Sequence, residues 1–459
     1  MFWPVFRAEA WKWRLFLACG SANLASSLPG GFVNAVLNTP TSIIKSWCNE
    51  SAIYHYNVIF SERQLNNLWS AVVSVYFVGG IIGALNGKIA DRIGRKGGLV
   101  LSGSLFLFSA LLALSSKTLN SFEVLMLSRF ISGYATGLTT AILPVYLNEI
   151  SPPELRGTTG ASASFGFSLG IFLAQALGFK MILGTEDYWH YLLSAYIPLI
   201  LLAACAVPFL PESPKYLLSK GYNKKAREEM SKLSQTPMDI VKDLEEEESN
   251  VQDWSLMRLI KDKSLRPKLI LTCWIMIGQQ FAGTVAVFNY SMKIFQDAGL
   301  SELQSQYASL LTGCNNSITA LLVIYVIKIF PRRTVLITSN CCVITSLILL
   351  STSIACKDVY FWMPYLSIFS IVTFIISNGM GLGPIPFFLG SELFDLGPRS
   401  AVMSLGTFGN WLAALIVSHS FLELNLIFGP LSFLFYAGQL LILTLHIIHS
   451  LPETNSKFL

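Results

Sequence analysis

An acidic and a basic residue recur with the same spacing in two distant segments of the chain. Glu149 and Arg156 stand in NEISPPELRG, and Glu392 and Arg399 stand in SELFDLGPRS. Each segment follows a long apolar run. Opposite charges that are partly removed from water attract each other strongly, so these residues could form ion pairs at the ends of apolar segments. The recurrence indicates two related halves with charged residues at corresponding places.

A short charged segment, GKIADRIGRKGG, is a third motif of this kind. Gly94 permits a tight turn there, and the charges around it correspond to those of IKIFPRRT in the second half of the chain. If these charges share one face of the protein, pairs across the boundary between the halves would hold that face shut. The alternative is that they only anchor the loops at a membrane surface. The residues expected to form the gate are Asp91, Arg92, Arg95, Glu149, Arg156, Arg332, Arg333, Glu392 and Arg399.

The composition is typical of a membrane protein. The chain has 459 residues, of which 53% are hydrophobic and 13% charged, and its mean hydropathy is +0.55. Soluble domains carry about 25% charged residues, so this chain has too much apolar surface for one water-soluble core. The net charge of +5 does not indicate a nucleic-acid partner. The eight cysteines lack metal-ligand spacing, and neither a metal nor a cofactor is expected.

Twelve apolar segments are long enough to cross a bilayer. A helix needs roughly 20 apolar residues to do so, and lipid cannot satisfy the backbone polar groups of irregular or open-sheet structure. The sequence therefore predicts an all-α integral membrane protein with twelve transmembrane helices in two six-helix halves. The predicted spans are 15–37, 67–86, 98–115, 122–146, 157–179, 190–209, 268–290, 304–327, 334–354, 361–388, 400–421 and 427–450. The amino-terminal segment lacks the pattern of a cleaved signal peptide.

The distribution of lysine and arginine predicts the orientation. Most of the 32 basic residues fall in cytoplasmic segments if both termini are in the cytoplasm. The long loop 38–66 then lies outside, where its NES sequence makes Asn49 a candidate glycosylation site. The hydrophilic stretch 211–267 lies inside and is expected to form short amphipathic helices. The predicted domains are the first six-helix half (1–210), this linker (211–267) and the second half (268–459).

Seven motifs, in order along the chain, resemble those of one transporter family. They are GKIADRIGRK, NEISPPELRG, PESPKYLL, GQQFAG, GLGPIPFF, SELFDLGPRS and LPET. The chain resembles the sugar porter branch of the major facilitator superfamily, and is most similar to the animal facilitative glucose transporters. The resemblance implies a major facilitator fold that carries a hexose down its gradient by alternating access. The glycosylation motif and the topology favour a plasma-membrane location. The expected partners are the sugar and the lipid bilayer, and a monomer would be sufficient for transport whatever the oligomeric state.

The resemblance also implies a sugar site. Side-chain amides offer both donors and acceptors, as sugar hydroxyls do, and an indole can lie against the apolar face of a pyranose. For each amide, the alternative is an ordinary hydrogen bond between helices. Pro384 and Pro386 in GLGPIPFF interrupt the tenth span and are a candidate hinge, or else a static kink. The implied substrate-binding residues are Gln279, Gln280, Asn316, Asn410, Trp411, Phe387 and Ser164.

Several positions depart from the family pattern. Ser164 and Phe387 stand where the family has a glutamine and often a tryptophan, while Val285 and Gly379 replace an asparagine and a glutamate. The triplet linked with glucose preference reads Gln280-Phe281-Ala282, and the loop after the eighth span has Lys328 and Pro331 in place of an acid and a glycine. A site with fewer hydrogen-bonding groups holds fewer hydroxyls. Glucose is the leading candidate, with fructose, another polyol or a less polar substrate as alternatives.

The spans offer little for proton coupling. Related proton-coupled carriers have an aspartate at the position of Val33, and no Asp or Glu stands in the middle of a predicted span. Arg129 is expected near the outer end of the fourth span, and His419 toward the outer end of the eleventh. Uniport is therefore favoured over proton symport. A nutrient sensor without net flux is the third alternative, whereas no nucleophile, phosphate loop or metal cluster points to an enzyme.

Overall fold

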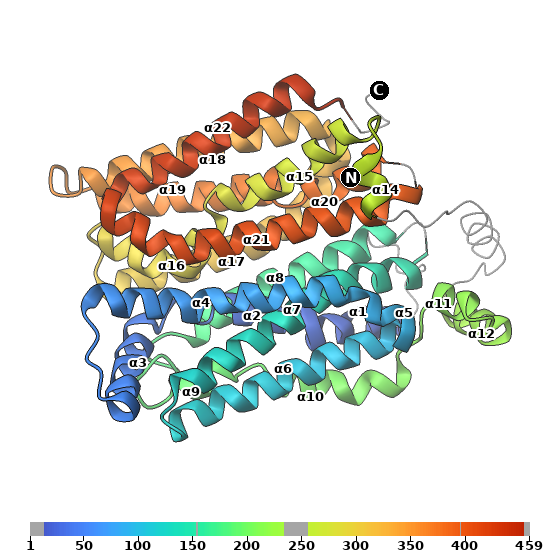
Figure 1. Ribbon diagram of the computed structural model, residues 1–459, viewed down its shortest axis with the longest axis horizontal. Helices are drawn as coiled ribbons and strands as arrows, with labels where there is room; N and C mark the ends of the chain where they lie inside the picture. The colour runs from blue at the N-terminus through green and yellow to red at the C-terminus, as the bar shows by residue number, and fades with distance from the viewer. Residues whose placement is uncertain (1–12, 153–154, 234–255, 395, 454–459) are drawn as a thin grey trace.

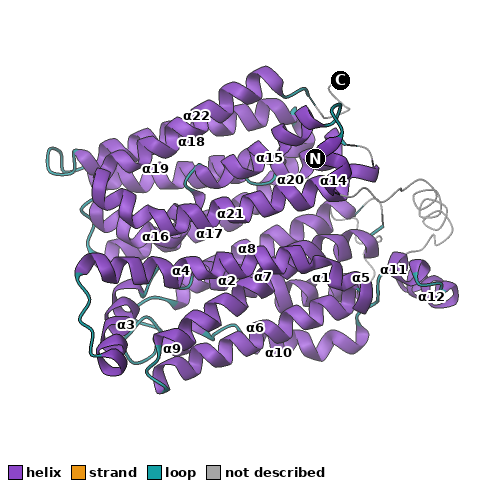
Figure 2. Ribbon diagram, in the orientation of Figure 1, coloured by secondary structure: helices purple, strands orange, loops and turns teal. Residues whose placement is uncertain are grey.

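Two bundles of long helices lie side by side in the computed structural model (Figure 1). The structure describes residues 13–152, 155–233, 256–394 and 396–453, and within them it contains helices and loops but no strand (Figure 2). The first bundle contains α1 (Trp13–Ala22), η3 (Asn23–Ser27), α2 (Leu28–Ala35), α3 (Thr41–Tyr56), α4 (Glu62–Leu85), η4 (Asn86–Ile89), α5 (Ala90–Ile93), α6 (Arg95–Thr118), α7 (Phe122–Ile150), α8 (Arg156–Leu177), α9 (Trp189–Leu193), α10 (Ile197–Ala206) and η5 (Val207–Phe209).

The second bundle follows after a short group of helices. It contains α15 (Arg266–Phe281), α16 (Thr284–Asp297), α17 (Glu302–Ile329), α18 (Arg332–Ala355), α19 (Met363–Ser377), η6 (Asn378–Leu382), α20 (Ile385–Leu393), α21 (Leu396–Phe428), η7 (Gly429–Leu431) and α22 (Ser432–Ser450). The connecting helices are α11 (Pro214–Ser219), α12 (Asn223–Leu233) and α14 (Leu256–Lys261). This arrangement agrees with the predicted two halves, while the exact domain boundaries stay a prediction.

Ten segments of the described chain are long and apolar enough to cross a membrane. The final segment, Ala401–Ser450, contains both most of α21 and α22. The first predicted span is not among the ten, although α1, η3 and α2 follow one another there without a break. The all-α membrane architecture is therefore confirmed, and the count of twelve spans stays a prediction.

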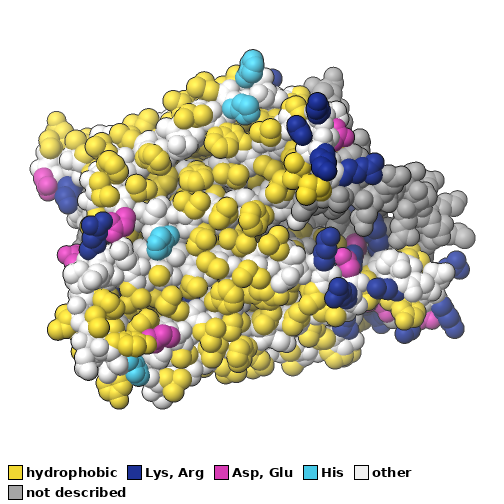
Figure 3. Space-filling model, in the orientation of Figure 1, with side chains coloured by type: hydrophobic (Ala, Val, Ile, Leu, Met, Phe, Trp, Pro, Cys, Tyr) yellow, Lys and Arg dark blue, Asp and Glu magenta, His cyan; other side chains and the backbone are white. Residues whose placement is uncertain are grey.

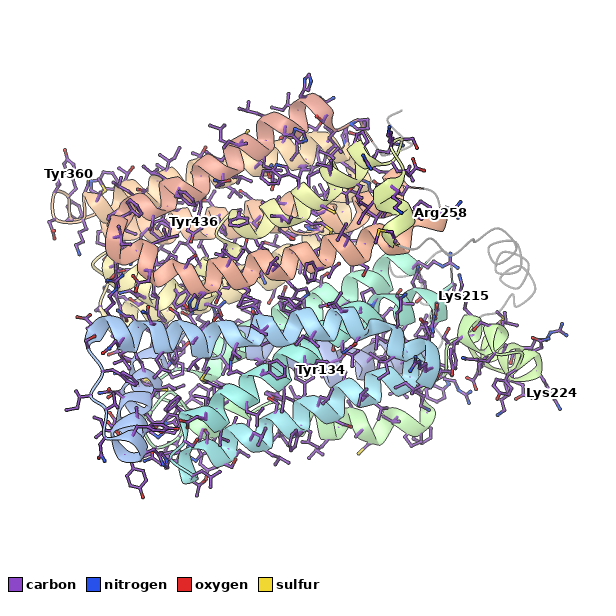
Figure 4. The ribbon with its side chains drawn as sticks, in the orientation of Figure 1. Tyr134, Lys215, Lys224, Arg258, Tyr360 and Tyr436 are labelled. Atoms are coloured by element: carbon purple, nitrogen blue, oxygen red, sulfur yellow. The ribbon has the colours of Figure 1, made fainter. Side chains whose placement is uncertain are left out.

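The two ends of the molecule differ in charge. Lys and Arg side chains gather at the end that carries α5, α12 and α14, called here the basic end, and hydrophobic side chains cover much of the face between the ends (Figure 3). Lys215, Lys224 and Arg258 lie at the basic end, whereas Tyr360 lies at the opposite end with α3 (Figure 4). The opposite end is called here the α3 end. The positive-inside rule assigns the basic end to the cytoplasm, and this orientation stays a prediction.

Matching helices of the two bundles begin in the same way. Ser61 starts α4 and Ser301 starts α17, and each hydroxyl accepts a hydrogen bond from the backbone N–H of the glutamine three residues later. The side chains of Gln64 and Gln304 bond back to the capping serines, which completes a capping box at both helices. The recurrence of Ser-Glu-x-Gln supports the two-half repeat that the charged motifs indicated.

Glycines allow the backbones of α4 and α7 to pack in direct contact. A Cβ placed on Gly79 would lie 2.0 Å from the carbonyl oxygen of Phe130, and one on Gly133 would lie 1.9 Å from that of Tyr76. No side chain fits at such distances, so glycine is required where the two backbones approach closely. This packing fixes α4, which contacts α21 of the other bundle across the seam between the halves.

Candidate functional site

Three side-chain amides form one hydrogen-bonded cluster in the second bundle. Asn410 of α21 donates from Nδ2 to Oε1 of Gln279 (2.7 Å) and to the carbonyl oxygen of Met276 (2.6 Å) on α15. Gln280 donates from Nε2 to Oδ1 of Asn410 at 3.0 Å. Gln279 and Asn410 are buried, and Oε1 of Gln280 is buried without a hydrogen-bond partner. The cluster therefore keeps one acceptor available, and it joins three of the residues that the sequence assigned to the site.

Trp411 follows the cluster along α21 and reaches across the seam. Its ring lies 6.1 Å, centroid to centroid, from the rings of both Tyr76 and Phe77 on α4. The same indole covers the backbone of Gly80, one turn further along α4. A large apolar ring and the amide cluster thus stand at consecutive positions of α21, the combination of residue types expected for a sugar site.

Asn316 lies at a second crossing of the seam. Its Nδ2 donates to Oγ of Ser168 on α8 at 3.0 Å. Ser164 stands one turn before Ser168 on the same helix and is exposed, and Phe387 on α20 is 42% exposed. The described hydrogen bonds do not join these residues to the amide cluster, and their part in substrate binding stays a prediction.

The helix break beside the prolines is connected to the amide cluster. The tenth predicted span is divided into α19, the π-helix η6 and α20, and Pro384 is the N-cap of α20. Gln279 donates from Nε2 to the carbonyl oxygen of Gly383 at 2.8 Å. The interruption predicted from Pro384 and Pro386 is present, while its motion as a hinge stays a prediction.

A second interruption, which sequence reasoning missed, lies directly after the glutamines. The predicted span 268–290 is divided into α15 and α16 at Gly283, whose φ of +87° is a left-handed conformation that favours glycine. The signal was present in the sequence, since Gly283 follows an apolar residue pair within GQQFAG. The break was not predicted, because the residues on both sides of Gly283 are apolar and the segment resembles one continuous span.

At the α3 end, hydrogen bonds join the two halves. Asn38, which follows α2, donates from Nδ2 to Oγ of Ser291 (2.7 Å) and of Ser309 (3.1 Å) in the second bundle. Its Oδ1 accepts from the backbone N–H of Met292 at 3.2 Å. Asn38 is 1% exposed, so one buried amide makes three polar contacts with the opposite half.

Two ion pairs close the rim at the same end. Arg63 of α4 pairs with Glu423 of α21 at 3.1 Å, and Lys180 after α8 pairs with Glu302 of α17 at 2.7 Å. Trp411 and Asn316, both predicted sugar-site residues, make further contacts across the seam with α4 and α8.

Lys45 of α3 also lies near this rim. Its Nζ donates to Oδ1 of Asn66 on α4. Partial burial lowers the pKa of Lys45, and repulsion by Lys293 of the second bundle lowers it further, against the opposing charge of Glu62.

Ion pairs at the basic end join helices of the same half. Arg95 pairs with Glu149 of α7 and with Asp91, in each case at 2.9 Å. In the second half, Arg332 pairs with Glu392 at 2.7 Å. Glu149 is thus paired with Arg95 here. The pairing across the seam that the sequence predicts stays a prediction for a state in which the basic end is closed.

The other predicted gate residues differ in their surroundings. Nε of Arg156 is buried without a hydrogen-bond partner. Arg333 donates from Nη2 to the carbonyl oxygen of Ile448 at 2.6 Å, and Arg92 is exposed. The side chain of Arg399 lies outside the described part of the chain, although its backbone belongs to α21.

Two glutamates that the prediction omitted cap helices at the basic end. Glu212 accepts from the backbone N–H groups of Arg95 (3.0 Å) and Lys96 (3.1 Å) at the start of α6. Glu453 accepts from those of Arg332 (3.0 Å) and Arg333 (3.1 Å) at the start of α18. A signal for them existed, because a Pro-Glu pair occurs in both PESPKYLL and LPET.

Comparison with known proteins decides the family. Residues 18–459 match the family described as "Sugar (and other) transporter". The chain belongs to the sugar transporter family. It is 34% identical over 452 residues to solute carrier family 2, facilitated glucose transporter member 1, from Gallus gallus, covering 97% of this chain and 91% of that protein. It is 32% identical to member 5 from Equus caballus, covering 96% and 90%. These relatives are transporters.

Solved structures confirm the major facilitator fold of this member of the sugar transporter family. A partially occluded inward-open form of the xylose transporter XylE from E. coli has a TM-score of 0.79 at 20% identity. The match covers 96% of this chain and 99% of the E. coli chain. The proton:xylose symporter form bound to 6-bromo-6-deoxy-D-glucose gives a TM-score of 0.77.

One departure from the family pattern, Gly379, has a local physical reason. A Cβ on Gly379 would lie 2.6 Å from Cγ2 of Thr319, so a larger side chain does not fit at this position. Val285 is buried in α16, where it offers no hydrogen bond. Pro331 is the N-cap of α18, and the side chain of Lys328 lies outside the described part of the chain.

The candidate glycosylation site lies on a helix. Asn49 belongs to α3 and is half-buried, with Oδ1 lacking a hydrogen-bond partner. Ser51 of the same motif is fully buried, donates to the carbonyl oxygen of Asn120 and accepts from the N–H of Phe122. Glycosylation of Asn49 stays a prediction.

A buried arginine contacts the position where coupled sugar transporters have an acid. Arg129 of α7 donates from Nη1 to the carbonyl oxygen of Val33 at 2.5 Å, and its guanidinium lies 4.8 Å from the ring centroid of Tyr76. Arg129 is 3% exposed. His419 is exposed, with Nδ1 3.4 Å from Oγ of Ser74 across the seam. Val33 itself carries no titratable group, and only its backbone carbonyl meets Arg129.

Proposed function

We propose that this protein is a facilitative uniporter for a hexose, with glucose as the leading candidate, that works by alternating access in the plasma membrane with both termini in the cytoplasm. The observation that carries the proposal is the amide cluster of Gln279, Gln280 and Asn410 beside Trp411. Membership of the sugar transporter family supports it, as do relatives that are named facilitated glucose transporters.

The chemistry of the cluster suits a sugar. Oε1 of Gln280 is a buried acceptor without a partner, and a sugar hydroxyl can donate to it. Gln279 and Asn410 hold each other in place, so their remaining donors and acceptors are oriented before the substrate arrives. The indole of Trp411 provides an apolar surface for the face of a pyranose ring. Each group thus has a separate function in binding.

The distribution of contacts supports alternating access. With the basic end in the cytoplasm, Asn38 and the two rim ion pairs seal the outer side, and the sugar would exchange with the inner side. At the inner side, Arg95 and Arg332 pair within their own halves. In the return step, we expect the charges of one half to pair with those of the other when the inner side closes.

The surroundings of Arg129 support uniport. A proton-coupled carrier needs a titratable group in its pathway, and an acid at position 33 would lie next to the Arg129 guanidinium. Val33 instead contributes only its backbone carbonyl. Arg129 therefore has a hydrogen bond and an aromatic ring as partners, neither of which takes up a proton at physiological pH. Sugar movement would then follow the sugar gradient alone.

Uptake into proteoliposomes tests the proposal. The purified protein is reconstituted and supplied with labelled D-glucose or D-fructose, with and without an imposed proton gradient, and labelled L-glucose measures leakage. Saturable D-sugar entry that is independent of the proton gradient is the expected result. Accumulation driven by the gradient would identify a symporter, and binding without entry would identify a sensor. If neither hexose binds or enters, the hexose assignment is wrong.

A further inference from the structure

Gly80 of α4 lies directly beneath the indole of Trp411. A Cβ placed on Gly80 would lie 2.1 Å from Cζ3, 2.3 Å from Cε3 and 2.7 Å from Cη2 of that ring. All three atoms belong to the six-membered part of the indole. Carbon atoms make contact at about 3.5–4.0 Å, so the ring occupies the space that any side chain at position 80 would need.

The helix that carries Gly80 cannot retreat from the ring. A Cβ on Gly137 of α7 would lie 2.1 Å from the carbonyl oxygen of Gly80, and one on Gly83 would lie 2.1 Å from that of Tyr134. The backbones of α4 and α7 are therefore already as close as helices can pack. An added methyl group at position 80 would have to move Trp411 and not α4.

Two aromatic residues complete a slot around the indole. Tyr76 and Phe77 stand one turn before Gly80, and both rings are tilted by just over 50° to that of Trp411. Tyr76 is held from behind by the guanidinium of Arg129, 4.8 Å from its ring centroid. The walls of the slot thus belong to the first half, whereas the ring that fills it belongs to the second half and adjoins Asn410 of the amide cluster.

We propose that Gly80 is a positioning residue for the sugar site, because its missing side chain sets how deeply Trp411 sits against α4. The inference rests on the proposed function in that it concerns the same site. Gly80 acts through the indole and makes no contact with the sugar itself. A side chain at this position lifts Trp411 out of its slot and away from its place next to the amide cluster.

Two measurements test the role of Gly80. Equilibrium binding of labelled D-glucose is compared for the wild type and Gly80→Ala, each also in a Trp411→Phe background. Phe lacks the part of the ring that lies over Gly80. Because the added methyl group displaces the indole from its slot, we expect Kd to rise about tenfold with Trp411 and less than twofold with Phe at position 411. Gly438→Ala on α22 is the control, because a Cβ there meets nothing within 4 Å.

The second measurement does not depend on the sugar. The protein is labelled with 5-fluorotryptophan, and the fluorine resonance of Trp411 is identified as the one missing from Trp411→Phe. We expect this resonance to move in Gly80→Ala and to stay in place in Gly438→Ala. An unmoved resonance, or an equal loss of glucose affinity in both backgrounds, would overturn the proposal. If the wild type binds no hexose while the resonance moves, the proposed substrate is wrong and the positioning role stands.

Discussion

At the scale of single residues, the most informative side chain is Gln280. Its amide nitrogen is bonded to Asn410, but its carbonyl oxygen is buried and lacks a partner. Leaving a buried acceptor unsatisfied costs about 1–3 kcal/mol. A residue that served only to join two helices would not need to carry this cost. The unpaired oxygen is better explained as an acceptor for a substrate hydroxyl.

Replacing Gln280 by leucine is therefore expected to weaken sugar binding strongly. The substitution keeps most of the side-chain volume but removes the hydrogen bond to the sugar and the one to Asn410. Loss of the hydrogen bond to the sugar leaves a substrate hydroxyl unpaired, at a cost of about 1–3 kcal/mol, which predicts roughly a tenfold rise in KM for glucose. Uptake kinetics in proteoliposomes measure it, with the amount of reconstituted protein determined in parallel.

Asn315→Ala is the matched control for that experiment. Asn315 is also an amide within a span, but it donates to the carbonyl oxygen of Val372 on α19 at 3.1 Å, away from the cluster. Its loss is expected to change KM less than twofold. Unchanged uptake by Gln280→Leu, or an equal defect in Asn315→Ala, would remove Gln280 from the site.

The candidate site was predictable in part from residue types. Polar amides are costly inside a span, so Gln279, Gln280 and Asn410 could be expected to face the interior. Their mutual hydrogen bonds, and the partner Ser168 for Asn316, depend on the rotation of each helix about its axis. The hydropathy of a span does not determine how the helix is rotated about its axis, and so does not show which neighbour each amide faces. Gly80 gave no signal at all, since its role follows from a ring on another helix.

At the scale of elements, two glutamates stabilise the starts of matching helices. The first N–H groups of a helix have no partner within it, and they carry a partial positive charge that attracts a carboxylate. Glu212 binds two such groups on α6, and Glu453 binds two on α18. Each glutamate comes from the segment that follows the last span of its half. It therefore fastens the end of each half to its third helix.

Removing either cap is expected to lower thermal stability. Loss of a helix cap costs about 1 kcal/mol, which corresponds to a fall in Tm of roughly 1–2 °C for a chain of 459 residues. Glu212→Ala and Glu453→Ala are compared by thermal unfolding in detergent. Glu228→Ala, at an exposed position of α12, is the control and should leave Tm unchanged. A Tm of Glu212→Ala equal to that of the control would show that the cap does not stabilise α6.

Helix interruptions mark the limit of what hydropathy predicts. The span 268–290 is read as continuous because the residues on both sides of Gly283 are apolar, yet the chain bends there into α15 and α16. The first span is likewise interrupted by the π-helix η3. The break near Pro384 was predicted, because proline removes a backbone donor. Bends that depend on glycine or π-helical turns leave the apolar pattern intact.

At the scale of the whole molecule, the two ion pairs that close the rim of the α3 end both have the cation on the first half and the acid on the second half. The first half contributes both cations, Arg63 and Lys180, and the second half contributes both acids, Glu423 and Glu302. One pair joins α4 to α21 and the other joins α8 to α17. The sequence predicted a charged gate only at the opposite end, because the recurring Glu–Arg motifs lie there and Lys180 and Glu423 belong to no repeated motif.

Reversing the rim charges is expected to open the outer side. The pairs are partly exposed, so each is worth at most about 1 kcal/mol. In Glu302→Lys with Glu423→Lys, attraction becomes repulsion at both flanks, and the equilibrium should shift toward the outward-open state by about fivefold. Ser291→Cys reports the shift, because Ser291 is 1% exposed and bonded to Asn38 in the sealed state. Its labelling by a membrane-impermeant maleimide added outside should accelerate by the same factor.

The matched rescue separates electrostatics from misfolding. Adding Arg63→Glu and Lys180→Glu to the reversed acids recreates both pairs with the opposite polarity, and labelling of Ser291→Cys should return to the starting rate. The experiment is done in a Cys356→Ser background, because Cys356 is partly exposed and follows α18 at the same end. If the fourfold variant labels as fast as the twofold variant, the rim charges do not hold the halves together. The buried contacts of Asn38 would then account for the seal alone.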